Sequence, residues 1–284
     1  MNKAYDFCGG NSPLIISMPH SGTCIPEDIK CRFTPEAALL PDADWHLPIL
    51  YDMAKEFDIS VISAKYARYV IDLNRSPDNT SLYPGQDVTG LCPIDTFAKR
   101  AIYLDKEQLD ENEVQDRIEQ YWQPYHQKLA TELQRIKGIH GVAILWDAHS
   151  IASHVPRFFS GKLPDLNFGT ANLTTCDVSL QDALALTMRE SIHSKNYSHV
   201  FNGRFKGGFI TRHYGMPNVN IHALQLEMSQ SIYMEENPPY KYDAILALEV
   251  KPLLADLLET CLHWAKNYKN LKACHPSPFD NICG

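Results

Sequence analysis

The chain has 284 residues, of which 44% are apolar and 21% are charged, a composition typical of a globular protein with a sizeable core. Its formal net charge of −8 and the lack of a basic run argue against nucleic acid or an anionic membrane surface as a partner. No apolar run approaches the roughly 20 residues that cross a bilayer, and the first residues lack the apolar core of a secretory signal, so we expect a cytoplasmic protein.

The first part of the chain is predicted to contain three strands and one helix. The apolar run at 13–19 closes with a proline and a Ser-Gly pair, which is typical of a strand that enters a loop. From Asp44 onward, apolar residues recur every four positions, which predicts a helix with one buried stripe: Trp45, Ile49, Met53 and Phe57. The β-rich runs at 60–64 and 68–74 predict two further strands.

The rest of the chain is predicted to alternate helices with strands. A long amphipathic helix covers 111–137, and Pro124 is expected to kink it. The continuous apolar run at 141–147 is flanked by glycine and predicts a central strand buried on both faces. The remaining elements are a helix at 180–195, an alternating strand at 219–229, a final helix at about 241–268 and an irregular tail at about 270–284.

Strands that alternate with helices indicate an α/β sandwich around a mixed, largely parallel sheet. No repeat, low-complexity block or long linker divides the sequence, so we expect residues 1–284 to form a single domain. In such sheets, ligands bind just beyond the carboxyl ends of the strands. The polar residues that end strands are therefore the candidates for a functional site.

Two histidines end different apolar strands, His20 in SMPHSG and His149 in LWDAHS. A lone histidine at a strand end is more often a capped core residue than a ligand, but a pair favours a shared site. Asp44, or alternatively Asp42, adds a carboxylate at the start of a helix, where an acid is also favoured as an N-cap. Two histidines and a carboxylate are a set that catalytic zinc requires, with a fourth position left for water. Because the eight cysteines form no CxxC pair, any metal ion must be held by such residues.

Two further acids lie within apolar strands. Glu227 is flanked by Leu226 and Met228, where the burial of an unpaired carboxylate is costly. It is a candidate for the base that takes a proton from water, and the alternative is a position on the solvent face of an edge strand. Asp147 points the same way as His149 on a regular strand, so it is either a supporting partner of that histidine or an alternative ligand. We expect the supporting role.

Arginines gather near these positions. The segment RYVIDLNR carries Arg68 and ends in Asn74-Arg75, while GRFKGGFITRHYG carries Arg204 and Arg212 among flexible glycines. Arginine forks bind carboxylates through two hydrogen bonds, so the cluster predicts a small substrate with one or two carboxylates. The competing interpretation is that each arginine is an ordinary surface residue paired with an acid.

Nine motifs together resemble the N-formylglutamate deformylase (N-formylglutamate amidohydrolase) family. They occur in the family's order from about residue 13 to about residue 260: SMPHSG, LPDADWH, RYVIDLNR, LYPGQDVTGLCP, YWQPYH, LWDAHS, PDLNFGTAN, NGRFKGGFITRHYG and HALQLEMSQSIYM. Any one of these motifs is a weak signal, but nine in register are highly specific.

The resemblance implies a phosphorylase/hydrolase-like fold, a three-layer α/β/α sandwich shared with zinc carboxypeptidases. The implied reaction is hydrolysis of N-formyl-L-glutamate to formate and L-glutamate, the last step of one bacterial route of histidine degradation. Zn²⁺, or another divalent ion such as Co²⁺, would be held by His20, Asp44 and His149, while Glu227 would activate the water. The carboxypeptidase-type pattern places the acid three residues after the first histidine, where this chain has Thr23, so Asp44 is the substitute.

The resemblance also implies contacts with a small dicarboxylate substrate. Asn74 and Arg75 resemble the pair that grips the α-carboxylate in related enzymes, and Arg68 resembles the arginine that polarises the scissile carbonyl. Three arginines remain for the side-chain carboxylate of glutamate: Arg212 as the first choice, then Arg204 and Arg157. The oligomeric state is not indicated by the sequence.

Other functions compete with this one. A related zinc-dependent deacylase of another N-acyl acidic amino acid fits the same residues. DAHS also resembles the Asp-x-His segment of arginase-like ureohydrolases, but the additional paired aspartates and the Gly-Gly-Asp-His segment of those enzymes are missing here. A non-catalytic binding protein for acidic metabolites would use the arginines alone, and the presence of all four candidate metal-site residues argues against it.

Overall fold

The computed structural model describes residues 3–80, 85, 87–104 and 109–274, and within these ranges seven strands form one mixed sheet. The strands are β1 (Tyr5–Cys8), β2 (Leu14–Met18), β3 (Ser60–Ala64), β4 (Ala143–Ile151), β5 (Leu166–Gly169), β6 (His199–Phe201) and β7 (Ile221–Ser229). Their order across the sheet is β1-β3-β2-β4-β7-β5-β6. The strands β3, β2, β4 and β7 run parallel to one another. β1 runs antiparallel to β3, while β5 and β6 run parallel to each other and antiparallel to β7. The prediction of an α/β fold around a mixed sheet is confirmed.

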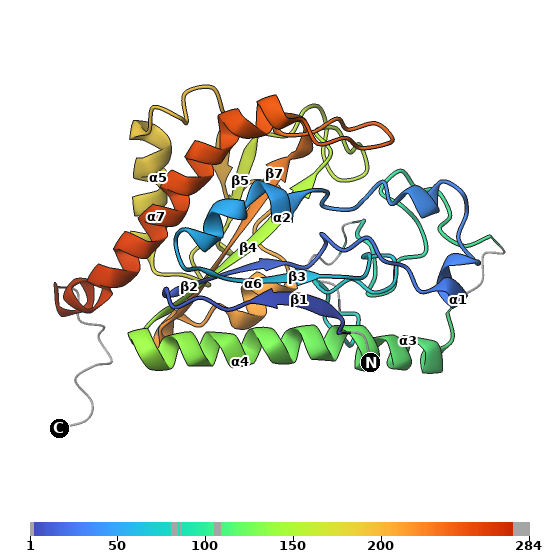
Figure 1. Cartoon of the computed structure of the whole chain (residues 1–284), viewed down its shortest axis with the longest axis horizontal. Coiled ribbons are helices and arrows are strands. Elements are labelled where there is room, and N and C mark those ends of the chain that lie inside the picture. The colour runs from blue at the N-terminus through green and yellow to red at the C-terminus, as the bar shows by residue number, and fades with distance from the viewer. Residues whose placement is uncertain (1–2, 81–84, 86, 105–108, 275–284) are drawn as a thin grey trace.

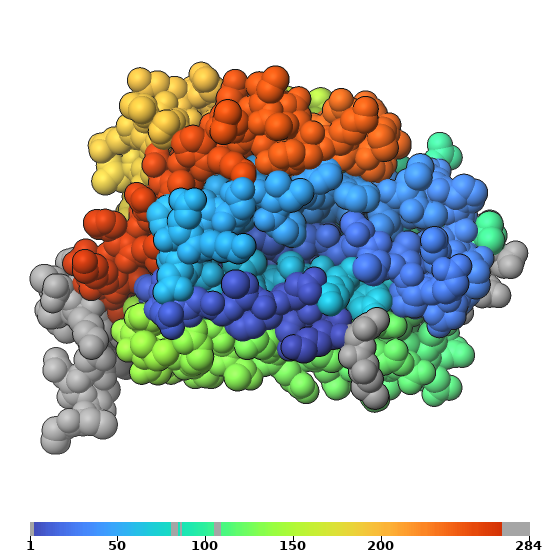
Figure 2. Space-filling view, in the orientation of Figure 1, coloured from blue at the N-terminus to red at the C-terminus, as the bar shows by residue number. Residues whose placement is uncertain are grey.

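Helices pack against both faces of this sheet (Figure 1). The helices are α1 (Glu27–Lys30), α2 (Leu47–Leu50), α3 (Glu111–Arg117), α4 (Gln123–His140), α5 (Val178–Glu190), α6 (Phe209–Tyr214) and α7 (Ala244–Cys274). Figure 1 shows α4 along one side of the sheet and α5 with α7 along the other. In the space-filling view the N-terminal segments, in blue, fill the surface between α7 and α4 (Figure 2).

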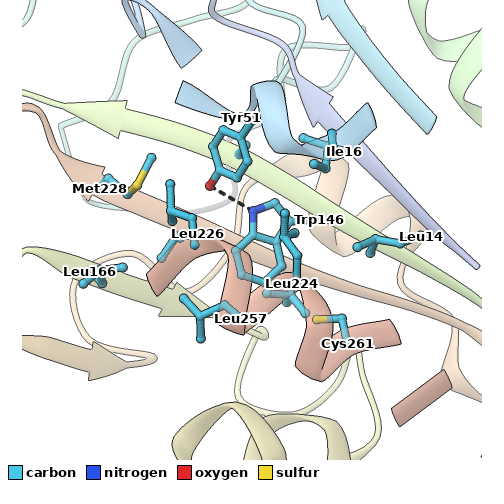
Figure 3. Packing of buried hydrophobic residues seen from close by; sticks show 14 of the residues in the cluster. Leu14, Ile16, Tyr51, Trp146, Leu166, Leu224, Leu226, Met228, Leu257 and Cys261 are labelled. Carbon is cyan, nitrogen blue, oxygen red and sulfur yellow. Dashed lines mark hydrogen bonds between the residues drawn. The ribbon is translucent and has the colours of Figure 1, made fainter. Parts of the chain in front are cut away.

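The core on the α7 side surrounds Trp146 of β4. This side chain is wholly buried, and its indole N–H donates a hydrogen bond of 3.1 Å to the Tyr51 hydroxyl (Figure 3). Leu224 and Leu226 of β7 and Leu257 of α7 lie around the ring in the same cluster. Because β4 is paired on both edges and covered on both faces, its sequence is a continuous apolar run rather than an alternating one.

The core on the α4 side is apolar at one end of the strands and polar at the other. Ile15, Leu145 and Ala223 lie in one cluster with Leu129 and Leu133 of α4. Two residues further along each strand, the same face presents Ser17, Asp147 and Gln225, all buried. The polar end is the carboxyl end of the parallel strands, where the sequence predicts the site.

The strands predicted at 13–19, 60–64, 141–147 and 219–229 are present as β2, β3, β4 and β7. The strand predicted at 68–74 is wrong, because this segment forms turns. Its apolar residues are buried in two clusters without pairing in the sheet. β-branched composition here reflects burial and not strand pairing.

The helix predicted from Asp44 is also corrected. It begins only at Leu47, as α2, because His46 has a left-handed backbone conformation with φ of 65° that does not fit a helix. A short 3₁₀ helix at Asp52–Lys55 follows α2. The helix predicted at 111–137 is α3, a π-helical turn at Ile118–Trp122 and α4. The irregularity that we expect from Pro124 is therefore a widened turn directly before it, since the proline ring supplies no N–H to the first turn of α4.

The last helices differ from the prediction at their ends. α5 ends at Glu190 instead of at 195, and α7 continues to Cys274, past the predicted end at 268. Residues 270–274 are thus helical and not part of an irregular tail, and the predicted tail at 275–284 lies outside the described residues. β1, β5, β6 and α6 are too short to show a hydrophobic period, so the sequence does not predict them. Among the described residues, no helix is long and apolar enough to cross a membrane.

Candidate active site

The predicted site residues come from neighbouring strands at the carboxyl end of the sheet. His20 follows β2 by two residues, whereas His149 lies inside β4, which is longer than predicted. His149 is directly opposite Glu227 of β7 in the parallel register, so both side chains point to the same face. Because β7 lies between β4 and β5, the alternative that Glu227 faces solvent from an edge strand is wrong.

Three of these residues form a group with the donor set of a metal site. One ligand atom each from His20, Asp44 and His149 lies within 4.8 Å of the others, and the three residues are only 2%, 1% and 2% exposed. Oδ2 of Asp44 is 3.1 Å from Nδ1 of His149 and 3.7 Å from Nδ1 of His20. Two imidazole nitrogens and a carboxylate oxygen that converge in this way fit a divalent ion such as zinc.

Backbone contacts place Asp44 between the two histidines. Its N–H donates to the carbonyl of His20, and its Oδ2 accepts from the N–H of Ser150, the residue after His149. Burial acts to raise the pKa of Asp44, but hydrogen bonds from His149 and His20 outweigh it and hold the pKa below its usual value. The carboxylate therefore stays ionised, as a metal ligand requires.

Asp42, the alternative carboxylate, lies outside this group. Its Oδ2 accepts hydrogen bonds from the Tyr69 hydroxyl at 2.5 Å and from the Phe97 N–H at 2.8 Å. Burial raises its pKa to about 6. Asp42 thus holds the loop around Phe97, and Asp44 is the carboxylate that approaches the histidines.

Each histidine also has a carboxylate beside its other nitrogen. Nε2 of His20 is 2.6 Å from Oδ1 of Asp72, and Nε2 of His149 is 3.2 Å from Oδ1 of Asp147. Such pairs fix which imidazole nitrogen carries hydrogen in metal sites. This is the arrangement expected if Asp147 supports His149 instead of ligating.

Asp72 also lies at the site, although no motif in the sequence singles it out. It is wholly buried and accepts hydrogen bonds from the backbone N–H of Asn74 at 2.9 Å and from Nη2 of Arg68 at 3.2 Å. Burial acts to raise its pKa, but the charges of Arg75, His20 and Arg68 lower it well below the usual value. The signal available in the sequence was an acid inside the apolar run RYVIDLNR, two residues before Asn74.

Glu227 is 8% exposed and stands beside the histidine group. Its Oε2 accepts a hydrogen bond of 3.2 Å from the amide of Gln225, whose own oxygen accepts from the Gly208 N–H at 2.8 Å. Burial raises the pKa of Glu227 to about 8. A carboxylate with this pKa exchanges a proton readily near neutral pH, which suits a general base.

A cavity of about 300 Å³ opens onto these residues. Its lining residues include His20, Asp44, Arg68, Asn74, Arg75, Phe97, His149, Phe158, Arg204, Phe205, Gly208, Gln225 and Glu227. The cavity thus combines the candidate metal ligands and the candidate base with three of the predicted arginines.

The arginines differ in how they are held. Nη2 of Arg68 lies 3.0 Å from Nδ1 of His20, so a cationic group already contacts the candidate ligand. Arg75 donates from Nε and Nη2 to the backbone and hydroxyl oxygens of Thr89, which fixes the plane of its guanidinium. Arg204 donates from Nε to the carbonyl of Phe158 at 2.6 Å.

The two remaining arginines lie elsewhere. Arg212 does not line the cavity among the described residues, and its Nε donates to the carbonyl of Gly207. Arg157 does not line it either, since its guanidinium binds Asp87 and Asp95 at 2.7 and 2.8 Å. The geometry therefore favours Arg204 over Arg212, the first choice from the sequence, as a ligand of a second carboxylate.

Comparisons with known proteins agree with the resemblance seen in the sequence. A family profile described as N-formylglutamate amidohydrolase matches residues 12–234. An N-formylglutamate deformylase of Pseudomonas putida is 46% identical over 270 residues, which cover 95% of this chain and 100% of the relative. One of Pseudomonas aeruginosa is 44% identical over 266 residues, which cover 94% of this chain and 98% of the relative.

Solved structures give the same result for the fold. The crystal structure of an N-formylglutamate amidohydrolase from Ralstonia eutropha superposes with a TM-score of 0.77 at 25% identity, covering 95% of this chain and 99% of that one. A gene product of Agrobacterium tumefaciens superposes with a TM-score of 0.68 at 15% identity, covering 92% of this chain and 96% of that one. The second likeness concerns the fold alone.

Proposed function

This chain belongs to the N-formylglutamate amidohydrolase family and is an amidohydrolase that cleaves the formyl amide of N-formylglutamate, and we propose that it does so with a metal ion at His20, Asp44 and His149. The observation that carries the metal dependence is the convergence of these three buried residues within 4.8 Å. Zn²⁺ fits this donor set, and Co²⁺ is the natural substitute. A divalent ion held there would act as a Lewis acid that makes water a nucleophile near neutral pH.

Membership of this family also supports proposals about the fold, the metabolic role and the substrate class. We propose that the fold is the phosphorylase/hydrolase-like three-layer α/β/α sandwich of the zinc carboxypeptidases, formed by one domain. The metabolic role that fits the reaction is the last step of a histidine degradation route in the cytoplasm. The substrate partner is a small dicarboxylate.

Glu227 and Arg68 are the proposed catalytic residues. Glu227 takes a proton from the water that attacks the formyl carbon and then passes it to the departing amine of glutamate. Arg68 donates hydrogen bonds to the carbonyl oxygen as negative charge develops on it, and a preorganised donor of this kind is worth roughly 3–4 kcal/mol. Both side chains line the cavity beside the histidine group, as these roles require.

Asn74, Arg75 and Arg204 are the proposed substrate-binding residues. Asn74 and Arg75 hold the α-carboxylate, and the bonds from Arg75 to Thr89 set the orientation of the guanidinium before the substrate arrives. Arg204, held at Nε by the carbonyl of Phe158, receives the side-chain carboxylate. Arg212 stays outside this proposal because it does not line the cavity.

The test is release of formate from N-formyl-L-glutamate by Glu227→Gln. We expect kcat to fall by about 10²- to 10⁴-fold, because the amide cannot accept the proton, while the bound metal measured by elemental analysis stays at the wild-type level. Glu119→Gln, a change at an exposed position that does not line the cavity, is the control and should keep full activity. Wild-type turnover by the Glu227→Gln variant would rule out Glu227 as the base. Equal turnover of N-formyl- and N-acetyl-L-glutamate by the wild type would broaden the substrate class to other N-acyl groups.

A further inference from the structure

Nε2 of His149 has two neighbours of opposite hydrogen-bonding character. Oδ1 of Asp147 lies 3.2 Å from this nitrogen, and so does Nδ2 of Asn74. A carboxylate oxygen only accepts hydrogen bonds, whereas an amide nitrogen only donates them. Nε2 satisfies Asp147 when it carries hydrogen and Asn74 when it does not, so the two residues compete for the same atom.

Neither competitor can turn over to suit the other. Oδ1 of Asn74 accepts a hydrogen bond of 2.8 Å from the backbone N–H of Ile210, which leaves the amide nitrogen facing His149. Asp147 is wholly buried, and its two oxygens accept from the hydroxyls of Ser17 at 3.3 Å and Thr211 at 3.0 Å. Both side chains are therefore fixed before any ligand binds.

In the neutral imidazole that a metal ion requires, the outcome of this competition decides the state of Nδ1, the nitrogen that faces Asp44. In a neutral imidazole one nitrogen carries hydrogen and the other carries a lone pair. Hydrogen on Nε2 leaves the lone pair of Nδ1 available for a metal ion. A bond from Asn74 to Nε2 instead places hydrogen on Nδ1, which then donates to Oδ2 of Asp44 at 3.1 Å and closes the metal site.

We propose that Asp147 is a positioning residue that keeps the hydrogen of His149 on Nε2 against the competition of Asn74, and thereby leaves Nδ1 free to ligate the metal. The inference rests on the proposed metal site at His20, Asp44 and His149. It assigns Asn74 a second effect besides substrate binding, since its amide disfavours metal binding whenever Asp147 is absent. Asn74 also lines the cavity, where its proposed partner is the substrate carboxylate.

The test is a double-mutant cycle read out as metal affinity. Zn²⁺ and Co²⁺ are titrated into metal-free wild type, Asp147→Ala, Asn74→Ala and the double variant, in competition with a chromophoric chelator. We expect Asp147→Ala to weaken metal binding by about 10- to 100-fold, as loss of such partners does elsewhere, and Asn74→Ala alone to change it by less than about threefold. The double variant should bind at least about fivefold more tightly than Asp147→Ala, because the competing donor is gone.

A purely structural role of Asp147 predicts no such rescue. Equal metal affinities of Asp147→Ala and the double variant would therefore contradict the proposal that Asn74 competes with Asp147 for Nε2. Asp147→Asn keeps the side-chain volume and should bind metal with an affinity between those of wild type and Asp147→Ala. Wild-type affinity of Asp147→Asn would overturn the positioning role. Glu132→Gln, which changes a buried carboxylate beside Ser60 and Arg135, is the control for lost buried charge and should keep wild-type metal affinity.

Failure of the metal site itself gives a different result. If wild type binds no metal, or if His20→Ala and His149→Ala bind it as tightly as wild type, the proposed function fails together with the inference. If wild type binds one ion that both histidine variants lose, and Asp147→Ala binds it with unchanged affinity, the metal site stands and the inference alone is overturned.

Discussion

His126 is a buried histidine that contacts the chain directly before Asn74. Its ring stacks on Trp122, with 3.7 Å between centroids, and its Nε2 is 2.9 Å from the carbonyl of Leu73. The Nδ1 atom is 2.9 Å from the Tyr214 hydroxyl. Desolvation lowers the pKa of His126 to about 3, so the ring is neutral in the folded protein at moderately acidic pH.

This burial predicts a pH-dependent loss of stability. The unfolded chain binds a proton at His126 below about pH 6.5 and the folded chain does not, so the free energy of unfolding falls as the pH drops from 6.5 towards 4. The slope from this one group is at most about 1.4 kcal/mol per pH unit. His126→Gln retains a donor for the carbonyl of Leu73 but should lack this contribution to the pH dependence. Urea titrations at pH 7, 6, 5 and 4.5 measure the free energy of unfolding of both proteins.

The exposed His193 provides the control, since His193→Gln should keep the wild-type slope. Identical slopes for wild type and His126→Gln would show that His126 does not remain neutral in the fold.

At the scale of elements, α6 reaches the site because glycine precedes it. A Cβ atom on Gly208 would lie 2.2 Å from Nδ2 of Asn74, and one on Gly169 of β5 would lie 2.5 Å from the backbone nitrogen of Gly207. The missing side chains let this backbone pass close to both, so that the Gly208 N–H reaches Gln225 and the Ile210 N–H reaches Asn74.

Gly208→Ala should therefore damage the site more than the fold. The added methyl group displaces the amide of Asn74, and overpacking of this kind costs about 1–3 kcal/mol of stability. We expect KM for N-formyl-L-glutamate to rise at least about tenfold in steady-state assays of formate release. Gly138→Ala in α4 is the matched control, because a Cβ there meets nothing within 4 Å and should leave KM unchanged and stability equal or higher. An unchanged KM for Gly208→Ala would remove Asn74 from substrate binding.

At the scale of the whole molecule, the candidate metal site joins segments far apart in the chain. His20 follows β2, Asp44 precedes α2, and His149 belongs to the central strand β4. An ion that binds only the folded arrangement stabilises the entire sheet by mass action, by about 2.7 kcal/mol when its free concentration is 100 times its Kd.

Removal of the metal should accordingly lower the melting temperature. For a protein of this size, we expect a chelator to reduce Tm by at least about 5 °C in calorimetry, with one transition before and after if the chain folds as a single domain. The His20→Ala/His149→Ala variant should melt at the same temperature with and without chelator. Equal Tm values for wild type in both conditions would argue against a bound ion, and two separate transitions would argue against a single domain.

Much of the fold could be predicted from the sequence because its strongest signals are local. The apolar runs at 13–19 and 141–147 are strands because their side chains must be covered on both faces, and the alternating pattern at 219–229 predicts a further strand. The two histidines and Glu227 can be identified because the burial of a polar group in or after an apolar strand is costly unless the group has a partner. The family motifs then specified the reaction, since their order along the chain is itself sequence information.

What only the tertiary structure decided concerns pairs of residues that are distant in sequence. The structure brings Asp44 and not Asp42 to the histidines, and Arg204 and not Arg212 to the cavity, because both choices depend on how loops cross the end of the sheet. In the sequence, Asp72 is one more residue of a β-rich run. In the fold, its Oδ1 lies 2.6 Å from Nε2 of His20. The hydrogen-bond partners of His149 are likewise set only when β4, α6 and the turn at Asn74 come together. No local pattern in the sequence encodes the contacts between these segments.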